Sequence, residues 1–197
     1  MKTRPSPPPG RVRPMVLGLA LGLLAACGAT PQERFYTLSA AAAAPAGAMP
    51  AAAAIFVGPV AVPDAVDRLP MVLTTGPNQV EIADLHRWAE PLEAAIPRVV
   101  AENLRRELGA ANVAWSRHAS GGTYAQRVAI EVQRFESSVA DGATLDAIWT
   151  VTPAKGAART GRSVIREPAS SADPAGIAAA HSRALARLAA DIAPALK

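Results

Sequence analysis

Residues 126–135 read QRVAIEVQRF and carry the clearest structural pattern of the chain. Val128, Ile130 and Val132 are apolar, whereas the residues between them are small or polar. This period of two predicts a β-strand with one buried face and one face in water. Phe135 breaks the alternation, so we expect a bulge or a strand end that turns its ring inward.

A partner strand is predicted directly after this one. Asp141-Gly142 is a typical turn pair, and the residues beyond it place four apolar side chains on one face: Leu145, Ala147, Trp149 and Val151. Residues Ser163 to Arg166 are a candidate for a further strand. Consecutive strands of this kind predict an antiparallel meander.

A helix is predicted from Pro91 to about Leu108-Gly109. Proline suits the first turn of a helix, and Glu93 puts negative charge at the positive end of the helix dipole. Apolar residues recur at every fourth position, on a stripe that a sheet can bury: Leu92, Ile96, Val100, Leu104 and Leu108. Charged residues point elsewhere, namely Arg98, Glu102, Arg105 and Arg106. Pro97 lacks an amide hydrogen, which predicts a kink or a helix that restarts there.

A second helix closes the chain. Asp173 is the expected N-cap and Pro174 the first helical residue, and the helix should stop near Pro194. Its predicted buried stripe comprises Ile177, His181, Ala184, Leu185, Leu188 and Ile192.

Shorter extended segments precede the first helix. Phe35 to Leu38 is a candidate strand, and residues 39–54 form an Ala/Pro stretch with no periodicity, which predicts a loop. Residues 55–63 read as an apolar strand in which Pro59 requires an edge or a bulge. Residues 71–74 and 80–82, joined through Gly76-Pro77-Asn78, are a hairpin candidate.

Together these elements predict an α/β fold. We expect a single domain in which a mixed, mostly antiparallel sheet is packed by two main helices as a layered sandwich.

The N-terminus carries a targeting signal, which is separate from the predicted fold. Four basic residues precede an apolar run, Met15 to Ala26, and Leu24-Ala25-Ala26-Cys27 closes it. This arrangement resembles the lipobox of bacterial lipoproteins, and twelve residues are too few to span a bilayer. It implies a signal peptide over 1–26, an acylated Cys27 and an N-terminal tether over 27–34, followed by a domain over 35–197. An ordinary cleaved secretory signal is the alternative reading.

Charge and cysteine content argue against two classes of function, nucleic-acid binding and thiol chemistry. The chain has 20 Lys and Arg against 16 Asp and Glu, but four of the cations lie in residues 1–26, so the mature chain is formally neutral. A nucleic-acid partner is therefore not expected. Cys27 is the single cysteine, so its acylation leaves no thiol for a disulfide or a nucleophile.

Several motifs resemble one family along nearly the whole mature chain. They are Val57-Gly58-Pro59-Val60 with Val62-Pro63, Asp67-Arg68, Met71-Val72, Arg87-Trp88-Ala89-Glu90-Pro91-Leu92, Ala101-Glu102-Asn103-Leu104, Val132-Gln133-Arg134-Phe135, and the last helix with Leu188, Asp191 and Ile192. This set resembles the PqiC-like family of ABC-type transport auxiliary lipoproteins. Asp67-Arg68 and the Arg87-to-Pro91 run are its specific parts.

The resemblance implies a non-catalytic component of an envelope lipid-transport system. Its partners would be an MCE-domain protein and ABC transporter components, with membrane attachment through the acyl chains and homo-oligomerisation left open. In the bacterial lipoproteins that the N-terminus resembles, an Asp after the acylated cysteine commonly retains the protein at the inner membrane. Gly28 at this position therefore implies the cell outer membrane, with the domain facing the periplasm. The alternatives are a periplasmic lipid-binding carrier with its own apolar pocket and a periplasmic hydrolase.

Five residues are candidates for partner binding: Asp67, Arg68, Arg87, Trp88 and Glu90. Tryptophan and arginine are enriched in interaction hot spots. The structural alternative places Trp88 in the core and pairs Arg87 with Glu90, Asp67 or another acid. For Asp67-Arg68 the alternative to partner contact is that the pair holds a loop.

No catalytic site, metal site or cofactor is predicted, apart from the covalent lipid on Cys27. His86, His118 and His181 lack the spacing of a helical metal site, and neither a nucleophile elbow nor a phosphate-binding loop occurs. His181 lies on an apolar stripe, which favours a packed histidine. Glu90 and Glu93 at a helix start favour capping and a dipole interaction over catalysis.

Overall fold

The computed structural model describes residues 31–41, 54–109, 112–115 and 123–197. Residues 33–197 form one compact unit, to which all that follows applies. The predicted leader, Cys27, most of the Ala/Pro loop and His118 lie outside the described residues.

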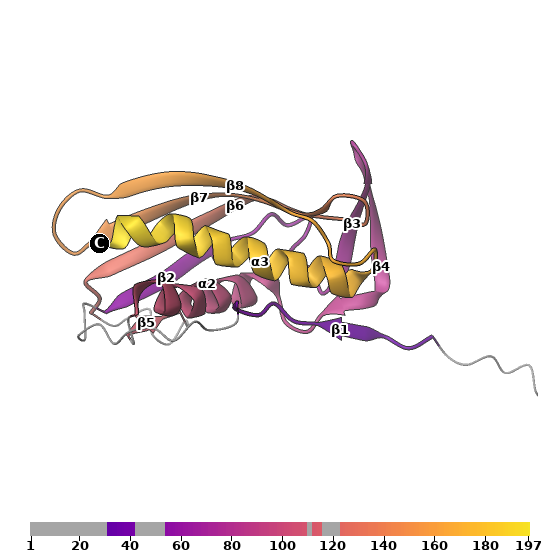
Figure 1. Ribbon diagram of the computed structural model, residues 1–197, viewed down its shortest axis with the longest axis horizontal. Coiled ribbons are helices and arrows are strands. Elements are labelled where there is room, and N and C mark those ends of the chain that lie inside the picture. The colour runs from indigo at the N-terminus through magenta and orange to yellow at the C-terminus, as the bar shows by residue number, and fades with distance from the viewer. Residues whose placement is uncertain (1–30, 42–53, 110–111, 116–122) are drawn as a thin grey trace, which may run out of the picture. The chain divides into compact units, whose positions relative to one another are not determined.

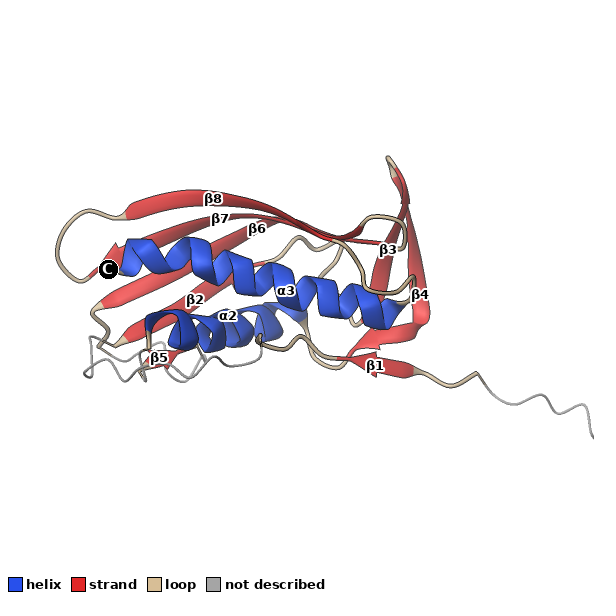
Figure 2. Ribbon diagram, viewed as in Figure 1, coloured by secondary structure: helices blue, strands red, loops and turns tan. Residues whose placement is uncertain are grey.

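The unit is an α/β fold built on one eight-stranded sheet (Figures 1 and 2). The strands are β1 (Arg34–Tyr36), β2 (Ile55–Ala61), β3 (Pro70–Gly76), β4 (Gln79–Trp88), β5 (Val113–Ala114), β6 (Gln126–Ser138), β7 (Gly142–Pro153) and β8 (Arg159–Glu167). Their hydrogen-bonded order is β1-β4-β3-β6-β2-β5, and β7 and β8 continue from β6.

The longest strand pairings are antiparallel, as expected. β6, β7 and β8 form the predicted meander, and β3 and β4 form the predicted hairpin. The parallel pairings are shorter and join β1 to β4, β2 to β5 and β6, and β3 to β6 at a single position. The sheet is therefore mixed.

Two helices, α2 (Leu92–Leu108) and α3 (Pro174–Ile192), pack against one another and against the sheet. α2 contacts β2 and β5, whereas α3 contacts β7 and β8. In Figure 2 both helices lie on the same side of the sheet. A short 3₁₀ helix, η2 (Ala193–Leu196), ends the chain. Every residue of the two predicted apolar stripes is buried, so the helix periodicity is confirmed.

Helix ends follow local chemistry. At the start of α3 the Asp173 carboxylate accepts a hydrogen bond of 2.7 Å from the backbone N–H of Gly176, which confirms the predicted N-cap. α2 ends at Gly109, whose φ of 60° is the left-handed conformation that glycine adopts at little cost. α2 is one continuous helix through Pro97, so the expected restart at that residue is wrong. The surrounding core buries Pro97 and holds the helix on both sides of it.

Both predicted bulges are present. The register of β6 against β7 shifts between Val132 and Arg134, and Phe135 is buried beyond the shift. The register of β2 against β6 shifts between Val57 and Val60, across the position of Pro59. Because a bulge leaves one residue out of the ladder, it tolerates a proline that has no amide hydrogen to donate.

Two of the predicted strands show how the observed limits differ from the expected ones. The strand expected at 35–38 is β1, one residue earlier and shorter, with Leu38 already in the core. The hairpin strand expected at 80–82 is β4, which continues to Trp88. It extends that far because its last three residues gain a second partner in β1, with Arg34 opposite His86 and Tyr36 opposite Trp88.

Candidate functional site

Backbone hydrogen bonds gather the five candidate residues around the end of β4. The N–H of Trp88 donates to the carbonyl of Leu69 at 2.7 Å, and the N–H of Ala89 donates to that of Tyr36 at 2.8 Å. The loop that holds Asp67 and Arg68 therefore lies beside the β4–α2 connection that holds Arg87, Trp88 and Glu90. We call these five residues the motif junction.

Trp88 is a core residue, as its structural reading predicted. It is 4% exposed, and it meets the rings of Phe135 and His181 edge-on, with centroids 6.2 and 6.0 Å away. Phe135 and His181 are stacked on one another at 3.8 Å. Trp88 thus ties β4 to β6 and α3, and a partner on the surface does not touch it.

Arg87 pairs with an acid other than the two that were named. Its Nη1 lies 2.9 Å from Glu33 Oε1, and both side chains are partly exposed. Arg87 Nε and Asp67 Oδ1 are both buried and have no hydrogen-bond partner among the described residues. Arg68 is exposed, so it is the member of the motif junction that an approaching protein can reach most directly.

Glu90 does not cap α2. Pro91 occupies the N-cap position and the helix has no side-chain cap, so the capping expectation for Glu90 is wrong. Its carboxylate instead accepts a hydrogen bond of 2.5 Å from Arg98 Nη2. The guanidinium offers a charged donor, which outcompetes a neutral backbone amide for the same carboxylate.

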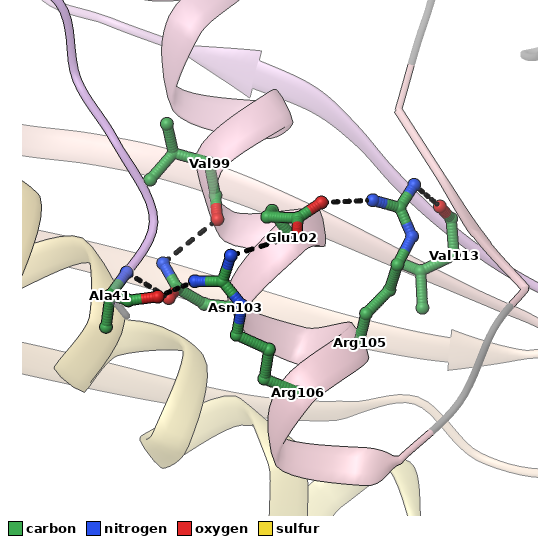
Figure 3. Close-up of polar contacts among 7 residues, drawn as sticks. All are labelled: Ala41, Val99, Glu102, Asn103, Arg105, Arg106 and Val113. Carbon is green, nitrogen blue, oxygen red and sulfur yellow. Dashed lines mark hydrogen bonds and ion pairs between the residues drawn. The ribbon is translucent and has the colours of Figure 1, made fainter. Parts of the chain in front are cut away.

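A polar cluster on α2 holds the segment that follows β1 (Figure 3). Arg98 donates to the carbonyl of Leu38 at 3.1 Å, and Asn103 Oδ1 accepts the N–H of Ala41 at 3.0 Å. Arg106 donates to the carbonyl of Ala41 and to Glu102. We call residues 38–41 the strap. No role for Asn103 was predicted, although a polar residue beside the apolar stripe of α2 was a signal for one.

Glu102 joins two arginines of the same helix. It accepts hydrogen bonds from Arg105 at 2.6 Å and from Arg106 at 3.0 Å. Arg105 reaches on to the carbonyl of Val113 at 2.6 Å, as Figure 3 shows. The charged face of α2 therefore fastens two chain segments, the strap and β5, to the helix.

A second group of charged residues lies on the meander. Arg162 donates two hydrogen bonds to Asp146, at 2.9 and 2.7 Å, and this contact lowers the pKa of that carboxyl. Arg134 holds Glu136 in the same way and lowers its pKa too. Asp191, which the family resemblance includes, accepts a hydrogen bond from Ser163 at 2.7 Å. These carboxylates are partnered, so they serve structure.

His181 is the most strongly perturbed group, and it lies in the core. Burial lowers its pKa to about 3, and Nε2 lies 2.9 Å from Ser137 Oγ. Both residues are buried, so a substrate has no path to this pair in the folded protein. The predicted packed histidine is confirmed.

Metal and pocket chemistry is sparse in the part of the chain that the structure describes. It contains no group of three His, Cys, Asp or Glu residues arranged to hold a metal ion. A hollow of about 550 Å³ lies over the strap, with Arg98, Glu102 and Arg106 in its wall, and a hollow of about 200 Å³ reaches Ser182 and Arg183. Charged walls of this kind do not suit acyl chains. No described helix is long and apolar enough to cross a membrane.

Residues 36–193 match the family described as ABC-type transport auxiliary lipoprotein component. The chain belongs to this family. The family is a transport auxiliary component and not a class of enzyme, and its description places its members at the cell envelope as lipoproteins. The predicted resemblance is thus confirmed.

Solved structures share the fold. A crystal structure of an uncharacterized protein matches with a TM-score of 0.69 and 17% identity, over 84% of this chain and 99% of that one. A crystal structure of protein XCC0632 from Xanthomonas campestris matches with a TM-score of 0.61 and 21% identity, over 81% and 92%. No curated protein sequence matches the chain.

Proposed function

We propose that this chain is a lipid-anchored periplasmic accessory subunit of an ABC/MCE-type envelope lipid-transport system. The match of residues 36–193 to the transport auxiliary lipoproteins carries the proposal. The lipobox-like Leu24-Ala25-Ala26-Cys27 supports it independently, because it lies outside the matched residues.

The anchor in this proposal is a set of acyl chains on Cys27. More than one chain makes such an anchor stable, since each buried methylene contributes about 0.8 kcal/mol. With Gly28 in the next position, we assign the anchor to the outer membrane and the domain to the periplasm.

In this proposal the subunit docks to its partners and supports membrane integrity, and it does not catalyse a reaction. The buried His181–Ser137 pair and the partnered carboxylates of the meander favour this reading. Within the motif junction, Arg68 is the exposed candidate for partner contact. The lipid-carrier alternative lacks support from the two hollows, whose walls include charged residues.

Affinity purification of the acylated protein from detergent-solubilised envelopes tests the proposal. Mass spectrometry should identify an MCE-domain protein and ABC transporter components among the recovered partners. Arg68→Glu should reduce their recovery, whereas Lys155→Glu, a charge reversal at another exposed residue in the β7–β8 turn, should not.

Two results would contradict the proposal. If neither an MCE-domain protein nor an ABC component is recovered, the proposed role in a transporter is wrong. Phospholipid that co-purifies with the chain alone, in stoichiometric amount, would favour the carrier instead.

A further inference from the structure

Large apolar side chains are exposed mainly at one end of the sheet. Seven large hydrophobic residues of the described chain are exposed, and five of them lie on β1, on β4 or just before β3. They are Phe35, Leu69, Val80, Ile82 and Leu85. Phe35 and Val80 are each 60% exposed. We call these five residues the apolar end.

The tip of the β3–β4 hairpin exposes both of its faces, whereas Met71 and Val72 of β3, farther from the tip, are buried. Residues Gln79 to Ile82 are all exposed, and successive side chains of a strand point to opposite faces. In Figure 1 the hairpin projects beyond the meander, at the end of the sheet where β1 lies. A hairpin tip that buries neither face stabilises the fold little, so the exposed Val80 and Ile82 on it need another explanation.

The edge of the hairpin is open as well. Only residues 86–88 of β4 pair with β1, so residues 79–85 have β3 on one side and no described strand on the other. Unpaired backbone N–H and C=O groups are costly in hydrocarbon and are satisfied among hydrated headgroups.

The proposed anchor brings this end of the domain close to a bilayer. Arg34, the first residue of β1, is seven residues after Cys27, and seven extended residues span at most about 25 Å. β1 pairs with residues 86–88 of β4, so the tether starts beside the base of the hairpin. The opposite end of the meander, at the β7–β8 turn, has no such short connection to the anchor.

We propose that the apolar end rests on the surface of the membrane that holds the acyl chains of Cys27. The inference rests on the proposed acyl anchor. Val80 and Ile82, which share one face of β4, enter the interface between headgroups and acyl chains, and the open edge of β4 stays among the headgroups. Exposed charges of both signs surround them, Arg34 and Arg68 with Glu81 and Asp84, so apolar burial and not net charge provides the attraction.

Site-directed fluorescence in proteoliposomes tests this contact. Acylation consumes the thiol of Cys27, so Val80→Cys introduces the one free thiol for an environment-sensitive dye. The full acylated protein is reconstituted into phosphatidylethanolamine and phosphatidylglycerol vesicles with nitroxide-labelled phospholipid. The matched control is Lys155→Cys, an exposed residue at the other end of the meander.

The dye at residue 80 should show blue-shifted emission and lose most of its fluorescence to a nitroxide near the headgroups, and less to one at the chain ends. The dye at residue 155 should keep both its wavelength and its intensity. Replacing phosphatidylglycerol with phosphatidylcholine should leave the result at residue 80 unchanged. Val80→Asp, tested against dye at Ile82→Cys, should abolish the shift, whereas Val164→Asp, at a valine of similar exposure (57%), should not.

Other outcomes overturn the proposal in distinguishable ways. An acylated protein with an unquenched dye at residue 80 overturns the membrane contact and leaves the proposed function intact. Two results together assign the surface to a second copy of the chain. The dye at residue 80 is then quenched neither by the nitroxide lipids nor by iodide in the water, and the unlabelled Val80→Cys protein forms disulfide-linked dimers. A mass spectrum without acyl chains overturns the anchor and this contact together.

Discussion

At the residue scale, His181 illustrates how burial turns an ionisable group into a packing group. Its ring stacks on Phe135 and meets the ring of Trp88 edge-on, and burial lowers its pKa from 6.5 to about 3. Below about pH 6.5, His181 therefore binds a proton in the unfolded chain but stays neutral in the folded chain. Stability is lost as the pH falls through this window, because protonation favours the unfolded state.

We expect the free energy of unfolding to decrease by about 1.4 kcal/mol for each pH unit between pH 6 and 4.5 on account of His181 alone. Urea unfolding of wild type and His181→Phe at several pH values measures this difference. The variant should lose this part of the pH dependence, and its loss of the Ser137 contact should cost stability at pH 7.5. Parallel pH profiles for the two proteins would contradict the assignment.

At the element scale, α2 acts as a clamp as well as a core helix. Its apolar stripe packs on the sheet, and its polar residues bind the strap through Arg98, Asn103 and Arg106. The strap has no helix or strand hydrogen bonds of its own. Its position therefore depends on side chains of α2, together with Ser182 of α3, which accepts the N–H of Ser39 at 3.1 Å.

Asn103→Ala should destabilise the domain by about 1–2 kcal/mol, because it removes a buried hydrogen-bonding side chain. Amide exchange at Ala41 should become faster in the variant than in the wild type, whereas exchange at strand positions of β6 should change less. Glu107→Ala, on the exposed face of the same helix, should change stability by less than about 0.5 kcal/mol. Unchanged exchange at Ala41 in Asn103→Ala would show that other contacts hold the strap.

At the scale of the whole molecule, residues 27–197 carry as many Lys and Arg as Asp and Glu, so they have no net charge to bind them to a membrane. Four basic residues within 1–26 account for the excess of cations in the full sequence. An attachment through charge would weaken in salt, whereas attachment through acyl chains and apolar side chains would not.

We therefore expect the protein to stay in the membrane fraction after a wash in 1 M salt, a concentration at which the screening length is only about 3 Å. Cys27→Ser should release the domain to the soluble fraction or leave its leader uncut. Immunoblots of fractionated envelopes measure both effects. Release of the wild type by salt, or unchanged attachment of Cys27→Ser, would argue against the acyl anchor.

Local patterns were enough for much of the fold. Three features reflect the geometry of a single element, so they are visible in the sequence: the alternation in β6, the apolar residues at every fourth position of α2, and the Asp173-Pro174 start of α3. The same holds for the bulge before Phe135, since a break in parity is visible in the sequence. These features were predicted correctly.

Long-range partners were not predictable in this way. The sequence by itself determined where the two helices and most of the strands lie and which side of each is apolar, and it left Trp88 open between the core and a partner surface. Only the tertiary structure decided that β4 extends to pair with β1, that Arg87 meets Glu33, and that the ring of Trp88 meets His181, 93 residues away. Periodicity depends on geometry within one element, whereas these contacts depend on how distant elements pack, which no local pattern encodes.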